Sequence, residues 1–243
     1  MIAKNEIFNV PYKLTIKNDK FNKKIDTEFD SKKIRLNLKN ELSYSDEVFK
    51  KGTIDVLFVN KTTAINYKIE KNNLIFKSED KNFFDGSFDF KPFYLKANFN
   101  YDGISTKNIL TQDSILVDLI RSEVFNNQNL NVNVFLNIKD VTNIAELNDL
   151  FLKIELDQGD INLSESRINW KDDLEINLKD GLINYDKDEI FLTGRIQIKT
   201  NDINNFYKSF QIKKNHRKEI DQIEFDFIYN FSKGKYRFDN VKI

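Results

Sequence analysis

The sequence predicts a mainly β fold, an elongated and curved antiparallel sheet with one or two short covering helices. The first observation is that apolar and polar residues alternate along most of the 243 residues, as in strands that bury one face. The second is that only two segments replace this period of two by a helical period. The third is that the chain holds seven Gly and two Pro, too few for a collagen-like or linker-like chain.

The alternating runs are the expected strands, and they follow one another in meander order. In the first run, Phe8, Val10 and Tyr12 have polar or small neighbours between them. We expect about fifteen strands in all. The main runs cover residues 8–16, 34–38, 54–58, 65–69, 74–76, 88–90, 93–99, 130–138, 150–156, 174–178, 190–198 and 223–231.

Two segments have helical spacing. Residues 111–125 place apolar side chains on one helical face, so this helix is expected to cap the apolar face of the sheet with Leu116 and Leu119 buried. Residues 202–210 are expected to form a short helix with Asp202 as its N-cap.

The first of these helices divides the chain, and no Pro- or Gly-rich linker accompanies it. The expected parts are residues 1–104, an N-terminal β-meander, and residues 105–243, a helix followed by a C-terminal β part. We expect the two parts to be consecutive stretches of one sheet system.

Most glycines fall between the alternating runs and indicate turns. Three Asp-Gly pairs, at residues 85–86, 102–103 and 180–181, favour hairpin turns because Gly tolerates a positive φ. Gly194 lies inside a run and indicates a β-bulge.

Composition excludes several classes of function. Lys+Arg and Asp+Glu each number 38, and a formal net charge of zero argues against a broadly basic nucleic-acid-binding protein. The chain has no Cys and one His, so it lacks a thiol nucleophile and the usual zinc ligands. It also lacks a Gly-rich phosphate loop. We therefore expect no enzyme activity, no cofactor and no metal site.

A basic run at residues 213–218 contains His216, the one histidine. A solvated loop is the simpler interpretation, and contact with anionic headgroups or with a partner is the functional one. A lone His has no sequence partners for a catalytic triad. For Trp170 we expect packing in the core or at a sheet edge in preference to stacking on a ligand.

The expected helices are too few to cover the expected sheet. A helix about 10–12 Å wide covers about two strands that are about 4.8 Å apart, so two helices cover about four or five of about fifteen strands. The remaining apolar surface either packs on itself, in a closed barrel or sandwich, or meets an apolar ligand in an open groove. The alternation is the same in both cases, and the sequence leaves both open.

The candidate lipid-facing residues lie on one side of the C-terminal strands. They recur at every second position, so their side chains point to one side of each strand, whereas neighbours such as Lys153 and Arg195 point to the other side. An apolar surface suits acyl chains, because each buried CH₂ contributes about 0.8 kcal/mol without directional partners. The candidates are Val132, Val134, Leu136, Ile154, Leu156, Ile196, Ile198, Phe225 and Phe227.

Several stretches of the sequence are similar to one known family. Residues 159–170 read GDINLSESRINW, residues 205–211 read NFYKSFQ, and residues 8–13 read FNVPYK. The second stretch is followed by Arg217, Ile220, Ile223, Phe225 and Phe227. The order of these residues from 159 to 227 resembles the C-terminal region of the bacterial AsmA-like proteins, and residues 8–13 resemble a repeated element of that family. The resemblance covers most of the chain.

The resemblance implies a taco-shaped, repeating β-groove in the periplasm of a Gram-negative envelope. It also implies a role in moving or controlling phospholipids between the membranes, and so in outer-membrane biogenesis. The implied partners are phospholipid acyl chains and membrane or inner-membrane proteins. Family members are usually anchored in the inner membrane by an N-terminal helix, whereas residues 1–17 hold no apolar segment typical of a signal peptide. We therefore expect a C-terminal piece of a longer protein, or a chain whose start has been lost or misread. The alternative is a closed β scaffold or interaction module without a lipid ligand.

Overall fold

The structure is a computed structural model. It describes residues 1–7, 10–44, 49–58, 61–80, 83–105, 120, 128–186 and 189–243. The helix expected over residues 111–125, with the burial expected for Leu116 and Leu119, lies outside the described residues apart from Ile120. Ile120 is helical and buried.

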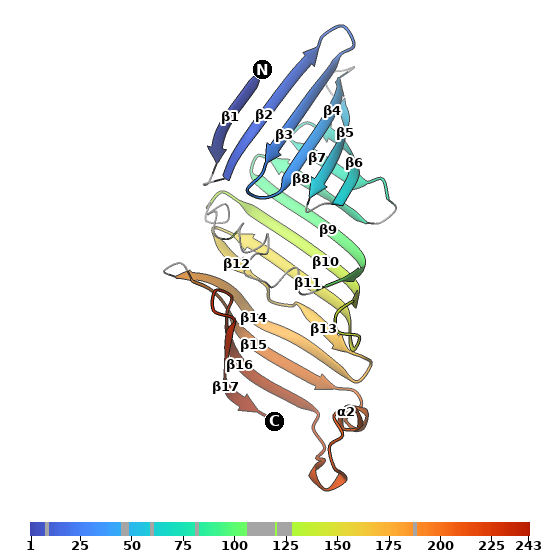
Figure 1. The fold of residues 1–243 in the computed structure, drawn as a ribbon, viewed down its shortest axis with the longest axis vertical. Helices are drawn as coiled ribbons and strands as arrows, with labels where there is room; N and C mark the ends of the chain where they lie inside the picture. The colour runs from blue at the N-terminus through green and yellow to red at the C-terminus, as the bar shows by residue number, and fades with distance from the viewer. Residues whose placement is uncertain are drawn as a thin grey trace. The chain divides into compact units, whose positions relative to one another are not determined.

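The fold is mainly β and antiparallel, as predicted. Seventeen strands belong to one sheet, and the described residues include one short α-helix (Figure 1). The strands are β1 Ile2–Ile7, β2 Val10–Asp19, β3 Lys24–Ser31, β4 Leu36–Tyr44, β5 Phe49–Phe58, β6 Lys61–Glu70, β7 Asn73–Ser78, β8 Phe84–Phe90, β9 Phe93–Ile104, β10 Asn131–Val141, β11 Leu147–Asp157, β12 Asp160–Asn162, β13 Arg167–Trp170, β14 Leu174–Asp186, β15 Glu189–Thr200, β16 Gln222–Asn230 and β17 Lys235–Lys242. The helix is α2, Ile203–Ser209, and a 3-10 turn, η3, follows at Lys214–His216.

Backbone contacts divide the chain into two units. The N-terminal unit comprises residues 1–99, 118–134 and 157–159. The C-terminal unit comprises residues 100–117, 135–156 and 160–243. The expected division of the chain after residue 104 stays a prediction.

In the N-terminal unit, β1 pairs with β2, and β2 to β9 continue as a meander in which each strand pairs with the next. The registers bring alternate apolar side chains to one face. Leu14 lies opposite Phe29, and Phe29 lies opposite Leu38. The other face is charged, with Lys39 opposite Glu28. Alternation along the sequence has thus become two faces of different polarity, as expected for period two.

Two glycines let aromatic rings lie directly on the strands of this unit. Gly52 lies opposite Tyr67, and Gly86 lies opposite Phe76. A Cβ atom on Gly86 would lie 2.2 Å from the carbonyl oxygen of Lys96 and 2.5 Å from the ring of Phe76. No other residue type fits at position 86 unless the backbone or the ring moves.

The prediction that the Asp-Gly pairs form hairpin turns was wrong. Residues 85–86 lie inside β8, 102–103 inside β9 and 180–181 inside β14. The register of β14 against β15 shifts at residues 180–181, so this pair forms a β-bulge opposite Gly194. The bulge predicted from Gly194 is confirmed, with the one extra residue on the partner strand, β14.

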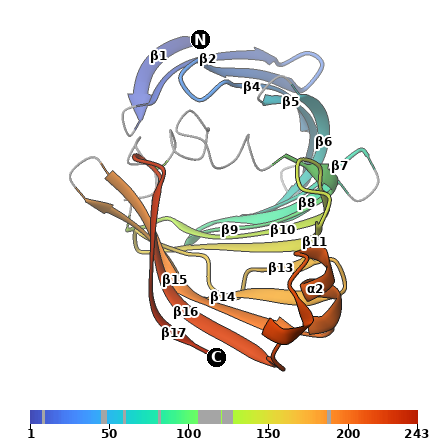
Figure 2. The ribbon, with the colours of Figure 1, turned by 60° about the horizontal axis from the view of Figure 1, so that its bottom comes forward.

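In the C-terminal unit, β13 to β17 pair in series. The strands β14 to β17 lie side by side in Figures 1 and 2. Within this unit, the described registers end with β17 on β16 and do not return to β13. These strands are therefore an open series, and a closed barrel is wrong for them.

The short helix predicted near residues 202–210 is α2. The carboxylate of Asp202 accepts hydrogen bonds from the backbone N–H groups of Asn204 and Asn205 at 3.0 and 3.1 Å. The predicted N-cap is thus confirmed. The helix follows β15 directly and lies near its end (Figure 2).

Candidate functional site

The C-terminal unit presents a continuous set of apolar side chains across neighbouring strands. Leu178 of β14 lies opposite Ile196 of β15, which lies opposite Phe225 of β16. A second row, two residues further along β15, repeats this pattern, and Phe227 of β16 lies opposite Phe238 of β17. We define the C-terminal apolar face as Ile176, Leu178, Ile196, Ile198, Ile223, Phe225, Phe227 and Phe238.

The described residues cover this face only in part. Its members on β14, β15 and β16 are half-buried, and Phe238 on β17 is 53% exposed. By contrast, Ile190 at the start of β15 is 0% exposed. The same strand therefore passes from a closed core at Ile190 to a partly open apolar surface at Ile196.

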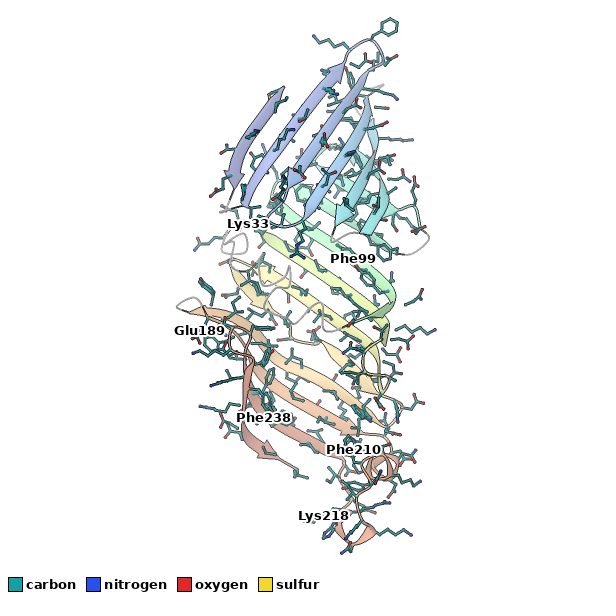
Figure 3. All side chains as sticks on the ribbon, in the orientation of Figure 1. Lys33, Phe99, Glu189, Phe210, Lys218 and Phe238 are labelled. Carbon is teal, nitrogen blue, oxygen red and sulfur yellow. The ribbon has the colours of Figure 1, made fainter. Side chains whose placement is uncertain are left out.

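Aromatic rings extend the exposed edge of the C-terminal apolar face. Phe225 and Phe238 meet edge to face with their ring centroids 5.2 Å apart. Tyr236, which is 70% exposed, lies at the same centroid distance from Phe238. Figure 3 labels Phe238 among the side chains of β17. These rings add apolar area where β17 is least covered.

The opposite side of the same strands is a hydrogen-bonded polar surface. Arg195 Nε donates to Asp226 Oδ1 at 2.8 Å, and Asn240 Nδ2 donates to Asp226 Oδ2 at 2.7 Å. The amide of Asn240 and then the guanidinium of Arg195 hold the pKa of Asp226 below its ordinary value. Gln197 donates to Glu224 at 2.8 Å. Polar partners therefore occupy this side, and the apolar side is the one suited to an apolar ligand.

The structure brings some of the nine predicted lipid-facing residues together and not others. Val132 and Val134 belong to the N-terminal unit, and the other seven belong to the C-terminal unit. Four of the seven are members of the C-terminal apolar face, namely Ile196, Ile198, Phe225 and Phe227.

The remaining three predicted residues lie on β10 and β11. Phe135 and Phe151 stack with ring centroids 6.3 Å apart, so they share one side of the sheet. Leu136, Ile154 and Leu156 alternate with them and point to the opposite side. Leu136 and Ile154 are half-buried, whereas Leu156 is 3% exposed and is packed against the chain itself. Contact with lipid stays a prediction for all nine residues.

Sequence reasoning missed two groups of aromatic residues. Tyr236 and Phe238 alternate with period two, but the expected strands ended at Phe231. Phe151 lies on the polar side of β11 beneath Arg167, whose guanidinium carbon is 4.9 Å from the ring centroid. An aromatic residue out of phase with its strand is the signal that could have indicated this cation–π contact.

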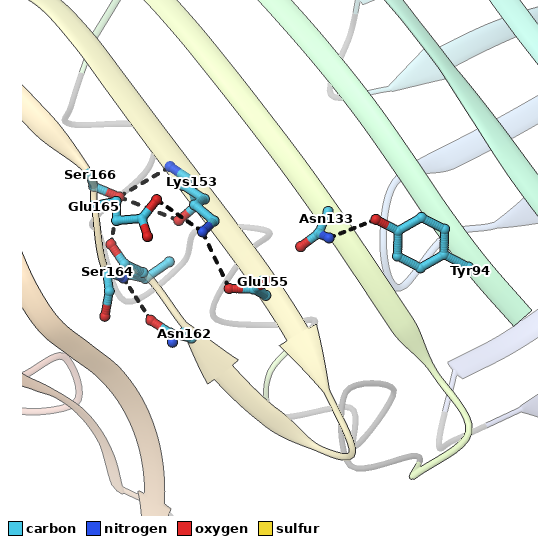
Figure 4. Close-up of polar contacts among 9 residues, drawn as sticks. Tyr94, Asn133, Lys153, Glu155, Asn162, Ser164, Glu165 and Ser166 are labelled. Carbon is cyan, nitrogen blue, oxygen red and sulfur yellow. Dashed lines mark hydrogen bonds and ion pairs between the residues drawn. The ribbon is translucent and has the colours of Figure 1, made fainter.

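Polar contacts attach residues 159–170, which carry part of the family resemblance, to β11 (Figure 4). Ser166 Oγ accepts a hydrogen bond from the N–H of Lys153 at 3.1 Å and lies 2.6 Å from the carbonyl oxygen of Leu163. Lys153 Nζ pairs with Glu165 at 3.1 Å, and this hydrogen bond raises the pKa of Lys153. Ser166 and Lys153 therefore hold the chain between β12 and β13 in place.

The polar face of the N-terminal unit has a hollow of about 530 Å³ on β2 to β5. Lys39 within it lies opposite Glu28 on one side and Asp55 on the other. Charges of opposite sign thus neighbour each other across the strands, as on a solvated sheet surface. We assign no ligand to this hollow.

In the part of the chain that the structure describes, no group of three or more acidic or histidine side chains could hold a metal ion. No helix in those ranges is long and apolar enough to cross a membrane.

No family model, no curated protein and no solved structure matches the chain. Membership of the AsmA-like family therefore stays a prediction.

Proposed function

We propose that the protein binds phospholipid acyl chains on its C-terminal apolar face. One observation carries the proposal: rows of apolar side chains run in register across β14, β15 and β16 and remain half-buried. Monomeric soluble proteins rarely expose a continuous apolar surface unless it binds something. An apolar ligand would complete the burial that the described residues leave unfinished.

The chemistry of the face suits hydrocarbon. Its side chains are Ile, Leu and Phe, which offer neither donors nor acceptors to a ligand. An acyl chain needs none, because each buried CH₂ contributes about 0.8 kcal/mol without directional partners. The headgroup would stay outside the face, where water solvates it. We therefore expect binding to depend on chain length more than on headgroup type.

For its role in the cell, we propose a periplasmic β-groove protein, or the C-terminal part of one. It would conduct phospholipids between the envelope membranes and so contribute to outer-membrane biogenesis. The support is the resemblance of residues 159–170 and 205–211 to AsmA-like proteins, together with the mainly β fold. The proposed partners are phospholipids and membrane or inner-membrane proteins, and no catalytic step is proposed.

The substitution Ile196→Asp tests the proposal. Ile196 lies between Leu178 and Phe225, and a carboxylate facing an acyl chain is costly to desolvate. We expect the affinity for a fluorescently labelled phospholipid to fall at least about tenfold, while cooperative thermal unfolding is retained. Gln197→Asp is the matched control, because it places a carboxylate one residue away on the polar side. It should leave lipid binding unchanged.

Two results would count against this function. One is a wild-type protein that binds no phospholipid while Ile196→Asp unfolds, which supports a closed scaffold. The other is equal loss of binding in Ile196→Asp and Gln197→Asp, which shows that the bound lipid does not use the C-terminal apolar face.

A further inference from the structure

Between β15 and β16 the chain leaves the sheet in a segment with an unusual charge. Residues 203–218, which we call the basic segment, contain five Lys or Arg residues and no Asp or Glu. The whole chain has a formal net charge of zero. The connection as a whole, residues 201–221, also holds Asp202, Glu219 and Asp221, so its net charge is +2, and the charge of +5 is confined to residues 203–218.

The basic segment has a defined structure. Tyr207 is buried, and its hydroxyl donates to the carbonyl oxygen of Lys218 at 2.8 Å. Arg217 Nε donates to the carbonyl oxygen of Ile212 at 2.8 Å, and its guanidinium lies over the Tyr207 ring at 6.0 Å. These contacts fold the end of the segment back onto α2. The connection is thus fixed by Tyr207 and Arg217.

The other four cations of the basic segment are directed to solvent. Lys208, Lys213, Lys214 and Lys218 are all exposed. Within the described ranges, none of the four forms an ion pair. Their charges are therefore available to an external anion. Figure 3 labels Lys218 in the loop that follows α2.

An exposed aromatic side chain accompanies these lysines. Phe210, at the end of α2, is 51% exposed. Its ring centroid lies 4.7 Å from that of Phe206 and 5.6 Å from that of Trp170 on β13. Packing on two other rings fixes the position of Phe210 and leaves its outer half open. Figure 3 shows Phe210 beside α2, in the same connection as Lys218.

We propose that the basic segment docks onto the surface of an anionic lipid bilayer. Lysines near an anionic membrane surface each contribute about 1 kcal/mol, a little over fivefold in affinity. The exposed ring of Phe210 in the same connection supplies the apolar contact that membrane-surface elements combine with charge. This inference goes beyond acyl-chain binding and does not require it, because it rests on α2 and the following loop and not on the C-terminal apolar face.

A bilayer fits these observations better than a nucleic acid does. Nucleic-acid binders usually extend their positive charge over a face of the domain, whereas the polar side of the neighbouring strands carries acids such as Glu224 and Asp226. An exposed, immobilised Phe210 also has a direct use at a bilayer interface. A soluble polyanion would use the lysines and leave the exposed half of the Phe210 ring without a contact.

Vesicle binding tests the proposal. The full chain is mixed with vesicles of phosphatidylcholine, or of phosphatidylcholine with about one third phosphatidylglycerol, and the bound fraction is measured by co-sedimentation. We expect binding to the anionic vesicles alone. The triple substitution Lys213→Gln, Lys214→Gln and Lys218→Gln should weaken it about 100-fold. These side chains make no described contact that the fold needs, so the triple variant should keep its circular dichroism spectrum and thermal midpoint.

The matched control is Lys139→Gln, Lys179→Gln and Lys199→Gln, three exposed lysines of the same unit. It removes the same charge and should reduce vesicle binding less than about threefold. Phe210→Ala should weaken vesicle binding several-fold and leave binding to heparin, a soluble polyanion, unchanged. The proposal is overturned if neutral and anionic vesicles bind alike, if neither binds, if the control variant loses as much as the test variant, or if Phe210→Ala has no effect.

A loss of vesicle binding is distinguishable from a failure of the proposed function. Ile196→Asp should leave docking on anionic vesicles intact while it weakens binding of a single labelled phospholipid. The triple lysine variant should show the reverse pattern.

Discussion

The apolar faces of the two units differ in the polar groups that they contain. In the N-terminal unit, the Tyr67 hydroxyl donates to Asn40 Oδ1 at 2.6 Å, and Ser31 Oγ donates to the carbonyl oxygen of Pro11 at 2.8 Å. Tyr67 and Ser31 are both buried. In the C-terminal unit, the rows that cross β14, β15 and β16 contain apolar side chains alone.

This difference indicates that the apolar faces of the two units have different roles. The N-terminal apolar face is the side of β2 to β7 that carries Leu14, Phe29, Leu38, Tyr67 and Phe76. A buried polar group needs a partner inside the protein, so this face is specified by its own hydrogen bonds. The C-terminal apolar face specifies no polar partner, whereas the apolar side chains of both faces, for example Leu38 and Ile196, are alike half-buried. We therefore interpret the first as a structural core and the second as a surface that accepts a ligand.

The largest expected effect separates closed from open positions on β15. Ile190→Ala should lower the free energy of unfolding by about 4 kcal/mol, because Ile190 is 0% exposed and its loss leaves a cavity. Ile196→Ala on the half-buried face should cost about half as much. Urea denaturation of both variants measures the difference. Equal losses would show that Ile196 belongs to a closed core.

The second prediction concerns the glycine beneath Phe76. Gly86→Ala should destabilise the protein by about 3 kcal/mol, because the new methyl group meets the ring of Phe76 and the carbonyl oxygen of Lys96. Gly234→Ala is the control: its φ is 62°, but nothing lies within 4 Å of a new Cβ atom, so the cost should be about 1 kcal/mol. Chemical denaturation that ranks the two variants in the opposite order would contradict tight packing of the N-terminal apolar face.

A smaller effect is expected for the hydroxyl group of Tyr67. Tyr67→Phe leaves Asn40 Oδ1 without its 2.6 Å partner and should cost about 1–2 kcal/mol in the free energy of unfolding. Tyr236→Phe, at a side chain that is 70% exposed, should change stability by less than about 0.5 kcal/mol. If both substitutions were neutral, the polar groups of the N-terminal apolar face would not specify its packing.

The smallest expected effect is a pH dependence from the polar side of the C-terminal strands. The contacts of Asp226 with Asn240 and Arg195 lower its pKa from 3.8. A carboxyl group with a lowered pKa in the folded state stabilises the fold above its unfolded pKa, and this contribution is lost as the pH falls through the folded value. The thermal midpoint of Asp226→Asn should therefore fall less than that of wild type between neutral pH and pH values below about 4. If the thermal midpoints of the two proteins fell equally with pH, the carboxylate of Asp226 would make no pH-dependent contribution to stability.

Period two predicted most of the strands, because alternating burial depends on the residue order alone. The main runs did not cover β1, β3, β12, β13 and β17. The α2 N-cap was predictable for a similar reason: Asp202 acts on the backbone two and three residues ahead. The Asp-Gly rule failed because it considers only local turn chemistry. Gly86 is required by the Phe76 ring on the neighbouring strand, and such a cross-strand contact is invisible before pairing is known.

The candidate site was predictable only in part. Alternation assigned Ile196 and Phe225 to one side of their strands, and the registers place them opposite each other. The burial of Leu156 at 3% exposure could not be predicted, because it depends on which elements pack over each strand. The aromatic residues of β17 were missed because the expected strands stopped before Tyr236.

Photo-crosslinking tests the central claim most directly. The wild-type protein is loaded with a phospholipid that carries a photoreactive diazirine in its acyl chain, irradiated, and mapped by peptide mass spectrometry. We predict crosslinks at the members of the C-terminal apolar face on β15, β16 and β17, namely Ile196, Ile198, Ile223, Phe225, Phe227 and Phe238. Crosslinks confined to the polar side, for example at Gln197 or Glu224, or a protein that takes up no phospholipid, would contradict the account.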